Sequence, residues 1–361
     1  MIRTIIGYGR RAMLPAIALL SLASGCKELP VEVPKIDLFS LNCPGVTEHF
    51  AYVDTFLVVG HRGAGNKEVE NTIPSYERAL ADGANAIELD FCMTSDGEIV
   101  VWHDWDPNST IALLREQGGE LAQKYKPRFP PVNDPLRRPM DELTLQEFRD
   151  NYYYTTKNLI DKERVPAVIP TFEDFLKWAA DNDNIYTVFY DIKIPKDKGY
   201  LSEKMIGKMD SLVKLYHPKY KGVYITPYEN VWTSINQIID GTGLSFDVDL
   251  GGGLVDDNTC EISSSRFAAQ RSVGGYATTM HPFTWTEAPW STLKRLLYCD
   301  LQRRDAPVAE GEHRLVEKVF AATINDDEKL RCLVDFGVDG ILTDDVALLA
   351  SIAKEKGKFI R

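Results

Sequence analysis

Short apolar runs recur along most of this chain, and they constrain its fold more than any other feature. The runs cover residues 57–60, 86–91, 185–192, 222–226, 244–250, 276–280, 319–324 and 340–343. Helical periodicity separates several of them, at residues 73–82, 172–181, 202–216, 228–240 and 326–336. Strands that alternate with helices form parallel sheets, and eight such strands are typical of a (β/α)8 barrel. The α/β pattern therefore predicts a TIM barrel over residues 55–355, a length that suits one such domain.

The second run carries two carboxylates. Side chains alternate across a strand, so Glu88 and Asp90 point to one side while Ile87 and Leu89 point to the other. Two neighbouring carboxylates on an apolar strand are unfavourable unless a positive charge lies between them. Mg²⁺ or Ca²⁺ would satisfy them, because these hard cations prefer oxygen ligands. We therefore expect a divalent metal site at this strand.

Residues 99–103 form a further apolar run, which cannot lie parallel to the second strand. Residues 94–98 alone connect the two, and a parallel crossover needs roughly a dozen residues or more. The run is therefore expected to return antiparallel, as a β-hairpin excursion after the second strand. With the Asp-Gly pair at 96–97 as a two-residue turn, Asp90 lies opposite His103, and a bulge would shift this register by one residue.

Short polar motifs follow these runs in a fixed order. They are His61-Arg62-Gly63, Glu70-Asn71-Thr72, Glu88-Leu89-Asp90, Thr94 with Asp96-Gly97, His103-Asp104, Pro170-Thr171-Phe172-Glu173, Asp191-Ile192-Lys193, Thr323-Ile324-Asn325 and Gly337-Val338-Asp339-Gly340-Ile341-Leu342-Thr343-Asp344. Together they resemble the glycerophosphodiester phosphodiesterase family over roughly residues 55–350. One of these motifs alone would carry no weight, whereas the ordered set is specific. The resemblance implies a TIM barrel of the phospholipase C-like phosphodiesterase type.

The resemblance also implies a reaction and a role for each site residue. The reaction is metal-dependent hydrolysis of glycerophosphodiesters, the deacylated phospholipids, to glycerol 3-phosphate and an alcohol. The implied roles are general acid and base for His61 and His103, metal ligands for Glu88, Asp90 and Asp191, and phosphate contacts for Arg62 and Lys193. Histidines suit the proton transfers because their pKa lies near neutrality, and cations neutralise charge on the phosphoryl oxygens. The assignment of acid and base, and the choice between Ca²⁺ and Mg²⁺, stay open.

The predicted barrel brings these groups to one place. Active sites of such barrels lie at the C-terminal ends of the strands. His61 follows the first strand, Glu88 and Asp90 lie toward the end of the second, and Asp191 with Lys193 closes the third. One end of the barrel is therefore expected to collect all the proposed catalytic groups.

Two positions differ from the usual pattern of the family and leave other functions open. Asp191 stands where the family usually has Glu, and Ala322 stands where it often has Trp. With a membrane tether, these residues suggest a lysophospholipase D or a sphingomyelinase D-like phosphodiesterase that acts on lipids. The remaining alternative is a non-catalytic lipoprotein that binds polyol phosphates on an inherited barrel.

The N-terminus predicts export and lipidation. Basic residues precede an apolar run at 12–22, and three small residues lead into Cys26. This pattern is typical of a signal peptide over residues 1–25, and the run is shorter than the roughly 20 residues of a membrane-spanning helix. The small residues before Cys26 resemble a bacterial lipobox. We therefore expect an exported bacterial lipoprotein, anchored through lipidated Cys26 and a tether at 26–54, at the periplasmic face of a membrane or the cell surface.

The charge of the chain bears on its partners. The formal net charge is −12, and no basic cluster interleaved with aromatic residues occurs. Nucleic acid is therefore not expected as a partner. The family resemblance implies a small-molecule glycerophosphodiester as the partner.

Residues 105–168 form the longest stretch between predicted strands. Such an excursion beside a barrel mouth either shapes the substrate site or is a solvated surface loop. Beyond it, Thr171 is expected to cap the helix at 172–181, with Glu173 and Asp174 favourable in the first turn.

Overall fold

The computed structural model describes residues 55–157, 163–226 and 318–358, together with residue 360 and short stretches or single residues between 228 and 307. The predicted signal peptide at 1–25, the predicted lipidation site Cys26 and the tether at 26–54 lie outside the described residues. In the described part of the chain, no helix is both long and apolar enough to cross a membrane.

Within the described residues, eight parallel strands form one curled sheet. They are β1 (Leu57–Gly60), β2 (Ala86–Met93), β6 (Thr187–Ile192), β7 (Lys221–Ile225), β8 (Val248–Asp249), β9 (Gly275–Thr278), β10 (Val319–Ala322) and β11 (Gly340–Thr343). Their order is β7-β6-β2-β1-β11-β10-β9-β8, and all neighbours are parallel. The outer strands β7 and β8 come within 8 Å of each other between Cα atoms. This order follows the chain around a ring, and each strand overlaps its predicted run, so the predicted TIM-barrel fold is confirmed.

The pairing of β2 with β6 sets the position of the acidic side chains. The register runs without a break and puts Glu88 beside Phe189 and Asp90 beside Asp191. Neighbouring residues in paired parallel strands face the same side of the sheet. Glu88, Asp90 and Asp191 therefore share one face, and that face is the inside of the barrel.

Alternate strand residues fill the barrel interior below these carboxylates. The apolar cluster there consists of Leu57, Val59, Ala86, Phe189, Val223, Ile225, Phe320, Ala322 and Leu342. The rings of Phe189 and Phe320 meet edge to face, with centroids 5.1 Å apart. Ala322 is fully buried in this cluster.

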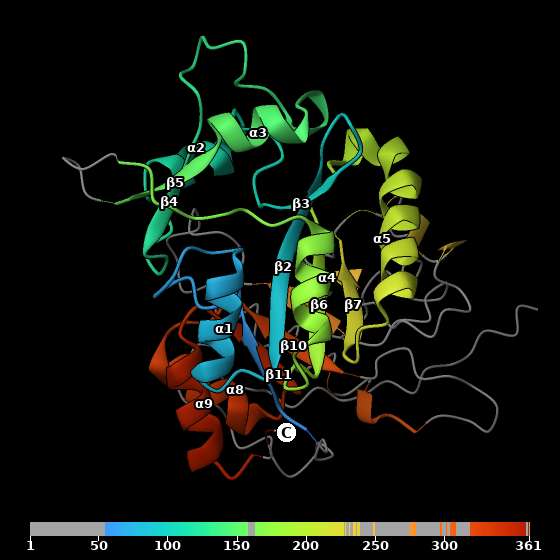
Figure 1. The fold of residues 1–361 in the computed structure, drawn as a ribbon. Coiled ribbons are helices and arrows are strands. Elements are labelled where there is room, and N and C mark those ends of the chain that lie inside the picture. The colour runs from blue at the N-terminus through green and yellow to red at the C-terminus, as the bar shows by residue number, and fades with distance from the viewer. Residues whose placement is uncertain are drawn as a thin grey trace, which may run out of the picture.

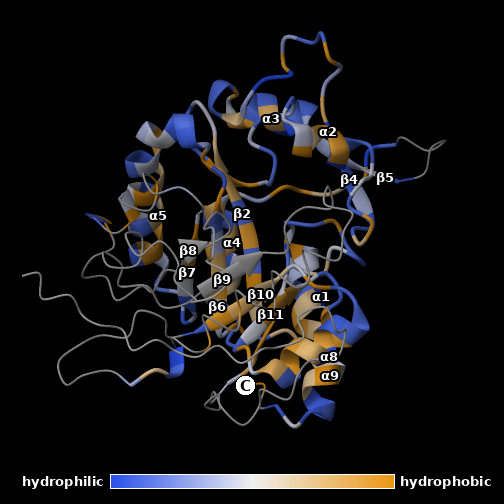
Figure 2. Cartoon of the chain, turned by 180° about the vertical axis from the view of Figure 1, so that it is seen from behind, coloured by the Kyte–Doolittle hydropathy of each residue, from blue (hydrophilic) through white to orange (hydrophobic). Residues whose placement is uncertain are grey.

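Helices cover the outside of the sheet. They are α1 (Ile73–Ala81), α4 (Phe172–Ala180), α5 (Ser202–Tyr216), α8 (Asp327–Phe336) and α9 (Val346–Glu355). Helices α4 and α5 lie beside β2, β6 and β7, whereas α8 and α9 lie beside β1, β10 and β11 (Figure 1). Figure 2 shows hydrophobic residues on the strands and on the helix faces toward them. The period of the apolar residues thus explains which face of each helix is buried.

Helix α4 begins as the sequence predicts. The Thr171 hydroxyl accepts the backbone N–H of Asp174, and the Asp174 carboxylate accepts the backbone N–H of Thr171. This reciprocal capping box satisfies two donors that the helix cannot pair internally. The prediction of Thr171 as N-cap is confirmed.

The predicted β-hairpin after β2 is present, but its predicted register is wrong by one residue. Strand β3 (Ile99–Val101) pairs antiparallel with β2, with Cys92 beside Val100. The backbone N–H of Trp102, not of His103, reaches Asp90 O over 3.0 Å. The reason is a three-residue loop at 95–97 closed by Gly97, whose φ of +83° is left-handed, in place of a two-residue turn.

The excursion at 105–168 is folded where the structure describes it. It contains α2 (Thr110–Glu116), β4 (Tyr125–Arg128), a 3₁₀ turn η1 (Met140–Glu142), α3 (Leu145–Asn151) and β5 (Tyr153–Thr156). Strands β4 and β5 pair antiparallel, and Trp102 packs against Phe148 and Tyr154 at the junction. Figure 1 places this unit beyond the C-terminal end of β2. The excursion is therefore a packed unit and not a solvated loop.

Candidate active site

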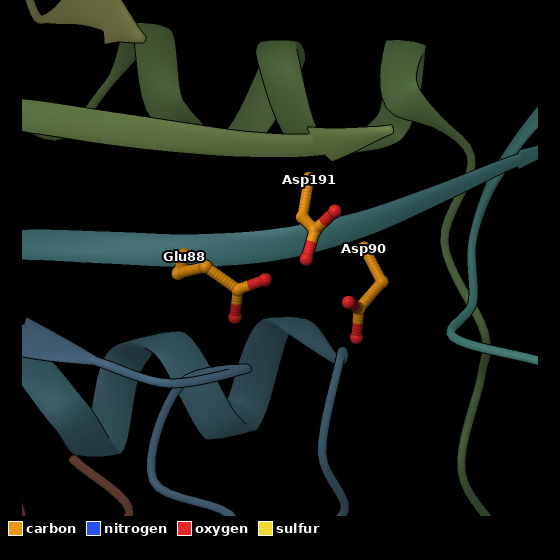
Figure 3. Close-up of side chains that lie close together, drawn as sticks. All are labelled: Glu88, Asp90 and Asp191. Carbon is orange, nitrogen blue, oxygen red and sulfur yellow. The ribbon is translucent and has the colours of Figure 1, made fainter. Parts of the chain in front are cut away.

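Three carboxylates converge where β2 and β6 end. Oxygen atoms of Glu88, Asp90 and Asp191 all lie within 4.8 Å of one another. Figure 3 shows their carboxyl groups pointing into a common space between the two strands and the chain below them. Glu88 and Asp90 are buried, and Asp191 is partly exposed. Hard divalent cations are bound by oxygen sets of this kind.

The electrostatics of the cluster favour a cation. Burial, followed by the charge of Asp90, raises the pKa of Glu88 to about 8. Burial also raises the pKa of Asp191, against the effect of Lys193. For Asp90 burial acts in the same direction, but the charges of Lys193 and Arg62 hold its pKa well below the usual value. Of the three carboxylates, Glu88 therefore has the least positive charge nearby to stabilise its ionised form. A bound divalent ion would supply that positive charge.

The two predicted phosphate-binding cations lie against the carboxylates. Lys193 Nζ is 2.6 Å from Asp191 Oδ2 and 2.9 Å from Asp90 Oδ1. Arg62 Nε is 2.9 Å from Asp90 Oδ2, and its Nη1 is 2.9 Å from Glu70 Oε2. Both cations are therefore next to the space that the carboxylates enclose. Their contact with a phosphate stays a prediction.

His61 is oriented by an acidic residue that directly follows the last strand, β11. Its Nδ1 lies 2.8 Å from Asp344 Oδ1, and Asp344 Oδ2 accepts Nδ2–H of Asn325 over 2.7 Å. With Nδ1 engaged, Nε2 is the ring nitrogen left for chemistry. Burial and Arg62 lower the pKa of His61, but Asp344 and Glu88 outweigh them, and the pKa is raised.

His103 has a similar partner but the opposite electrostatics. Its Nδ1 lies 2.9 Å from Asp104 Oδ1, while Asp104 Oδ2 accepts Nε–H of Arg115 over 3.0 Å. Arg115 thus neutralises the carboxylate that orients the ring. Burial, then the positive charges of Arg62, Arg115 and Lys193, lower the pKa of His103 well below its usual value.

The loop after β1 is held against β2 by polar contacts. The backbone N–H of Arg62, which has a left-handed φ of +55°, donates to Glu88 Oε2 over 2.9 Å. Asn71 Nδ2 donates to Asp90 Oδ2 over 2.7 Å. Glu70 pairs with Arg62 and also with Arg115. Glu70 and Asn71 therefore act here as residues that shape the loop.

The sequence did not assign roles to several residues of this site. Asn325 and Asp344 belong to motifs that carried the family resemblance, so their positions were a usable signal. Arg115, Glu120 and Gln123 come from the excursion, where no pattern singles them out. Glu120 contacts both Arg62 and Arg115, and Gln123 contacts Asp344. The excursion thus supplies charged and polar groups to the barrel mouth.

Comparison with known sequences places the chain among related proteins. The model of the glycerophosphoryl diester phosphodiesterase family matches residues 61–228. A glycerophosphodiester phosphodiesterase of Caldanaerobacter subterraneus subsp. tengcongensis is 50% identical over 302 residues, which are 83% of this chain and 99% of that protein. One from Bacillus subtilis is 35% identical over 120 residues, 29% of this chain, and the match spans 41% of its length.

Solved structures show the same fold. A Silicibacter pomeroyi protein described as a glycerophosphoryl diester phosphodiesterase superposes with a TM-score of 0.60 and 18% identity, covering 86% of this chain and 97% of its own. An Oleispira antarctica phosphodiesterase, solved in complex with the product sn-glycerol-3-phosphate, has a TM-score of 0.54 and 16% identity, covering 85% and 98%. At these identities the likeness shows a shared fold and does not by itself show a shared activity.

Proposed function

The chain belongs to the glycerophosphodiester phosphodiesterase family, and from this premise we propose that it hydrolyses glycerophosphodiesters to glycerol 3-phosphate and an alcohol. The observation that carries the proposal is the cluster of Glu88, Asp90 and Asp191 beside two histidines of opposite pKa shift. The product bound to the Oleispira relative supports glycerol 3-phosphate as the released phosphomonoester.

Glu88, Asp90 and Asp191 would hold the divalent cation, either Ca²⁺ or Mg²⁺. When bound there, the ion neutralises charge that builds up on the phosphoryl oxygens. Lys193 and Arg62, which lie against two of these carboxylates, add positive charge at the same place. Their ammonium and guanidinium groups orient the phosphodiester while it reacts.

The two histidines divide the proton transfers. His103, with its lowered pKa, is neutral near pH 7 and takes the proton of the attacking hydroxyl, either of water or of the substrate's glycerol. His61, with its raised pKa, is the protonated partner and gives its Nε2 proton to the leaving alkoxide. The O–P bond to the alcohol breaks as the new O–P bond forms, and the histidines exchange protonation states. Where glycerol attacks, this step gives a cyclic phosphate, which water then opens to glycerol 3-phosphate: His61, now neutral, takes the proton of the water, and His103, now protonated, gives a proton to the departing ring oxygen. Asp344 stabilises the ring of His61 while it is protonated and charged.

Product analysis with defined substrates tests this function. Glycerophosphocholine, glycerophosphoethanolamine and lysophosphatidylcholine are each incubated with Ca²⁺, Mg²⁺ or EDTA. We expect glycerol 3-phosphate from the first two only with metal. His61→Ala and His103→Ala should each lose about 10²- to 10⁴-fold in rate, whereas His217→Ala, a histidine at the end of α5, serves as the control. Full turnover in EDTA and in His61→Ala would refute the mechanism.

The same experiment separates the alternative functions. Faster turnover of lysophosphatidylcholine would indicate a lysophospholipase D, and sphingomyelin as a further substrate would identify a sphingomyelinase D-like enzyme. Binding of polyol phosphates without turnover of any substrate would indicate a non-catalytic lipoprotein.

The cellular location forms a separate part of the proposal. The protein would be exported and anchored to a bacterial membrane by lipid on Cys26, at the periplasmic face or the cell surface. Metabolic labelling with a radioactive fatty acid tests this. Label should enter the wild-type protein and be absent from Cys26→Ser, and equal labelling of both would exclude Cys26 as the anchor.

A further inference from the structure

The carboxylate of Asp344 is shared between His61 and a side chain of the excursion. His61 Nδ1 lies 2.8 Å from Asp344 Oδ1, and Gln123 Nε2 donates to the same oxygen over 2.5 Å. Asn325 Nδ2 donates to the other oxygen over 2.7 Å. Three partners thus fix the plane of this carboxylate, and one of them comes from outside the barrel.

Gln123 is held in place by burial and by its backbone. The residue is 4% exposed, and the backbone N–H of its neighbour Lys124 donates to Gly65 O over 2.8 Å. A Cβ on Gly65 would lie 1.8 Å from Gln123 Oε1. A side chain at position 65 would therefore displace the amide, so the loop after His61 and the glutamine are fitted to each other.

Of the two ends of the Gln123 side-chain amide, Nε2 is the one that faces the Asp344 carboxylate. An ionised carboxylate accepts hydrogen bonds and cannot donate, so Nε2 and not Oε1 points to it. Oε1 is then buried without a hydrogen-bond partner among the described residues. An unsatisfied buried amide oxygen is unfavourable, so packing alone gives no reason for a glutamine at this position. The contact with Asp344 does give one.

We propose that Gln123 is a positioning residue that acts through Asp344 on His61, which makes the excursion part of the catalytic apparatus. The inference rests on the proposed function, in which His61 is the general acid. By holding Oδ1, the amide keeps the carboxylate in the plane that orients the imidazole. It also takes up part of the negative charge that otherwise acts on the ring.

Gln123→Met tests the proposal, because methionine is similar in length and donates no hydrogen bond. The matched control is Gln117→Met, at an exposed glutamine that follows α2. In Gln123→Met we expect kcat for glycerophosphocholine to fall about ten- to a hundredfold, with KM within about twofold of wild type. Gln117→Met should leave both unchanged.

A second readout follows the protonation of His61. The charged groups that act most on this ring are Arg62, Asp344 and Glu88, and all three are still present in Gln123→Met. Loss of the amide should leave more of the Asp344 charge for His61, so the basic limb of the pH–rate profile should move to higher pH. The NMR titration of the His61 ring should move with it, and this measurement needs no turnover.

The outcomes separate this proposal from the proposed function. A folded Gln123→Met protein with wild-type kcat and an unchanged His61 titration would overturn the positioning role. If this variant does not fold, Gln123→Glu keeps the shape and sets a second carboxylate against Asp344, so its kcat should fall more above neutral pH than below. A pH dependence identical to wild type would then refute the role. A wild-type protein that hydrolyses none of the substrates would refute the proposed function. The NMR titration of the His61 ring would then still test whether Gln123 acts on His61 through Asp344.

Discussion

At the residue scale, the two histidines differ because of the charges that surround them. Among the described residues, the other side-chain contacts of Asp344 are the neutral amides of Asn325 and Gln123, so no directly bound cation offsets its effect on His61. Asp104 is instead paired with Arg115, and three cations act on His103. The proposed assignment of acid and base therefore rests on the difference between the partners, and not on a difference between the rings.

Asp344→Asn should test this assignment. The carboxylate and its hydrogen bond raise the pKa of His61, so their removal leaves burial and Arg62, which lower it. Fewer His61 rings are then protonated at a given pH, and the basic limb of kcat/KM should move to lower pH, with a loss of about tenfold or more near pH 8. Asp183→Asn, at an exposed aspartate, is the control. A limb that stays in place would assign the acid to another group.

The raised pKa of Glu88 predicts that the protein releases a proton when a divalent cation binds. Its pKa of about 8 means that it is mostly protonated at pH 7 without the ion, and a ligand carboxylate must be ionised. We expect release of up to about one proton at pH 7 and almost none at pH 10. Calorimetry in buffers of different ionisation enthalpy measures this number. The release should disappear in Glu88→Gln and persist in Glu203→Gln, on the exposed face of α5; equal release at both pH values would contradict the assignment.

At the scale of elements, the β2–β3 hairpin depends on one left-handed residue. Gly97 has a φ of +83° and closes a three-residue loop, and this sets which residue lies opposite Asp90. The chain leaves β3 after Val101, so His103 reaches the site from the segment beyond the strand.

Gly97→Ala should therefore lower the free energy of unfolding by about 1–2 kcal/mol, because a Cβ is unfavourable at this φ. Gly97→Asn should have a smaller effect, since asparagine tolerates the left-handed region. The nearest atoms to a new Cβ belong to the flexible end of Lys204, so steric overlap adds little. Urea unfolding of both variants measures the difference. Equal stability of the two would show that the backbone angle does not limit the loop.

At the scale of the whole molecule, a buried ionic network joins the excursion to the barrel. Arg115 of α2 lies between Glu70 of the loop after β1 and Asp104 beyond the hairpin, and it also pairs with Glu120. Arg115 and Glu70 are almost fully buried. Buried charges of this kind are tolerated only when each one is paired with a group of opposite charge.

Arg115→Met should consequently destabilise the protein by about 3–5 kcal/mol, because it leaves buried carboxylates without a partner. It should also raise the pKa of His103, since one of the cations that lower it is gone. Thermal and urea unfolding measure the first effect, and the acidic limb of the pH–rate profile measures the second. Lys219→Met, in an exposed pair with Asp183, should change stability little. A stability change as small as that of the control would mean that the network does not join the two parts.

Much of the fold and part of the site could be predicted from local patterns. The period of apolar residues marks the strands, and alternation along β2 puts Glu88 and Asp90 on one face before any contact is known. Thr171 and Asp174 mark the start of α4, because a capping box is formed by two residues that are three positions apart in the sequence. These features are short in range, so the order of residues determines them directly.

The tertiary structure decided what depends on distant segments meeting. His61 and Asp344 are 283 positions apart, and Gln123 and Asp344 are 221 apart. No periodic pattern in the sequence predicts these hydrogen bonds, because they form only when the barrel closes and the excursion packs against it. The amino-acid sequence by itself thus determined the barrel and the acidic strand. Only the folded chain decided the partner of His61 and the charges that surround both histidines, since pKa depends on burial and on charges brought near from anywhere in the sequence.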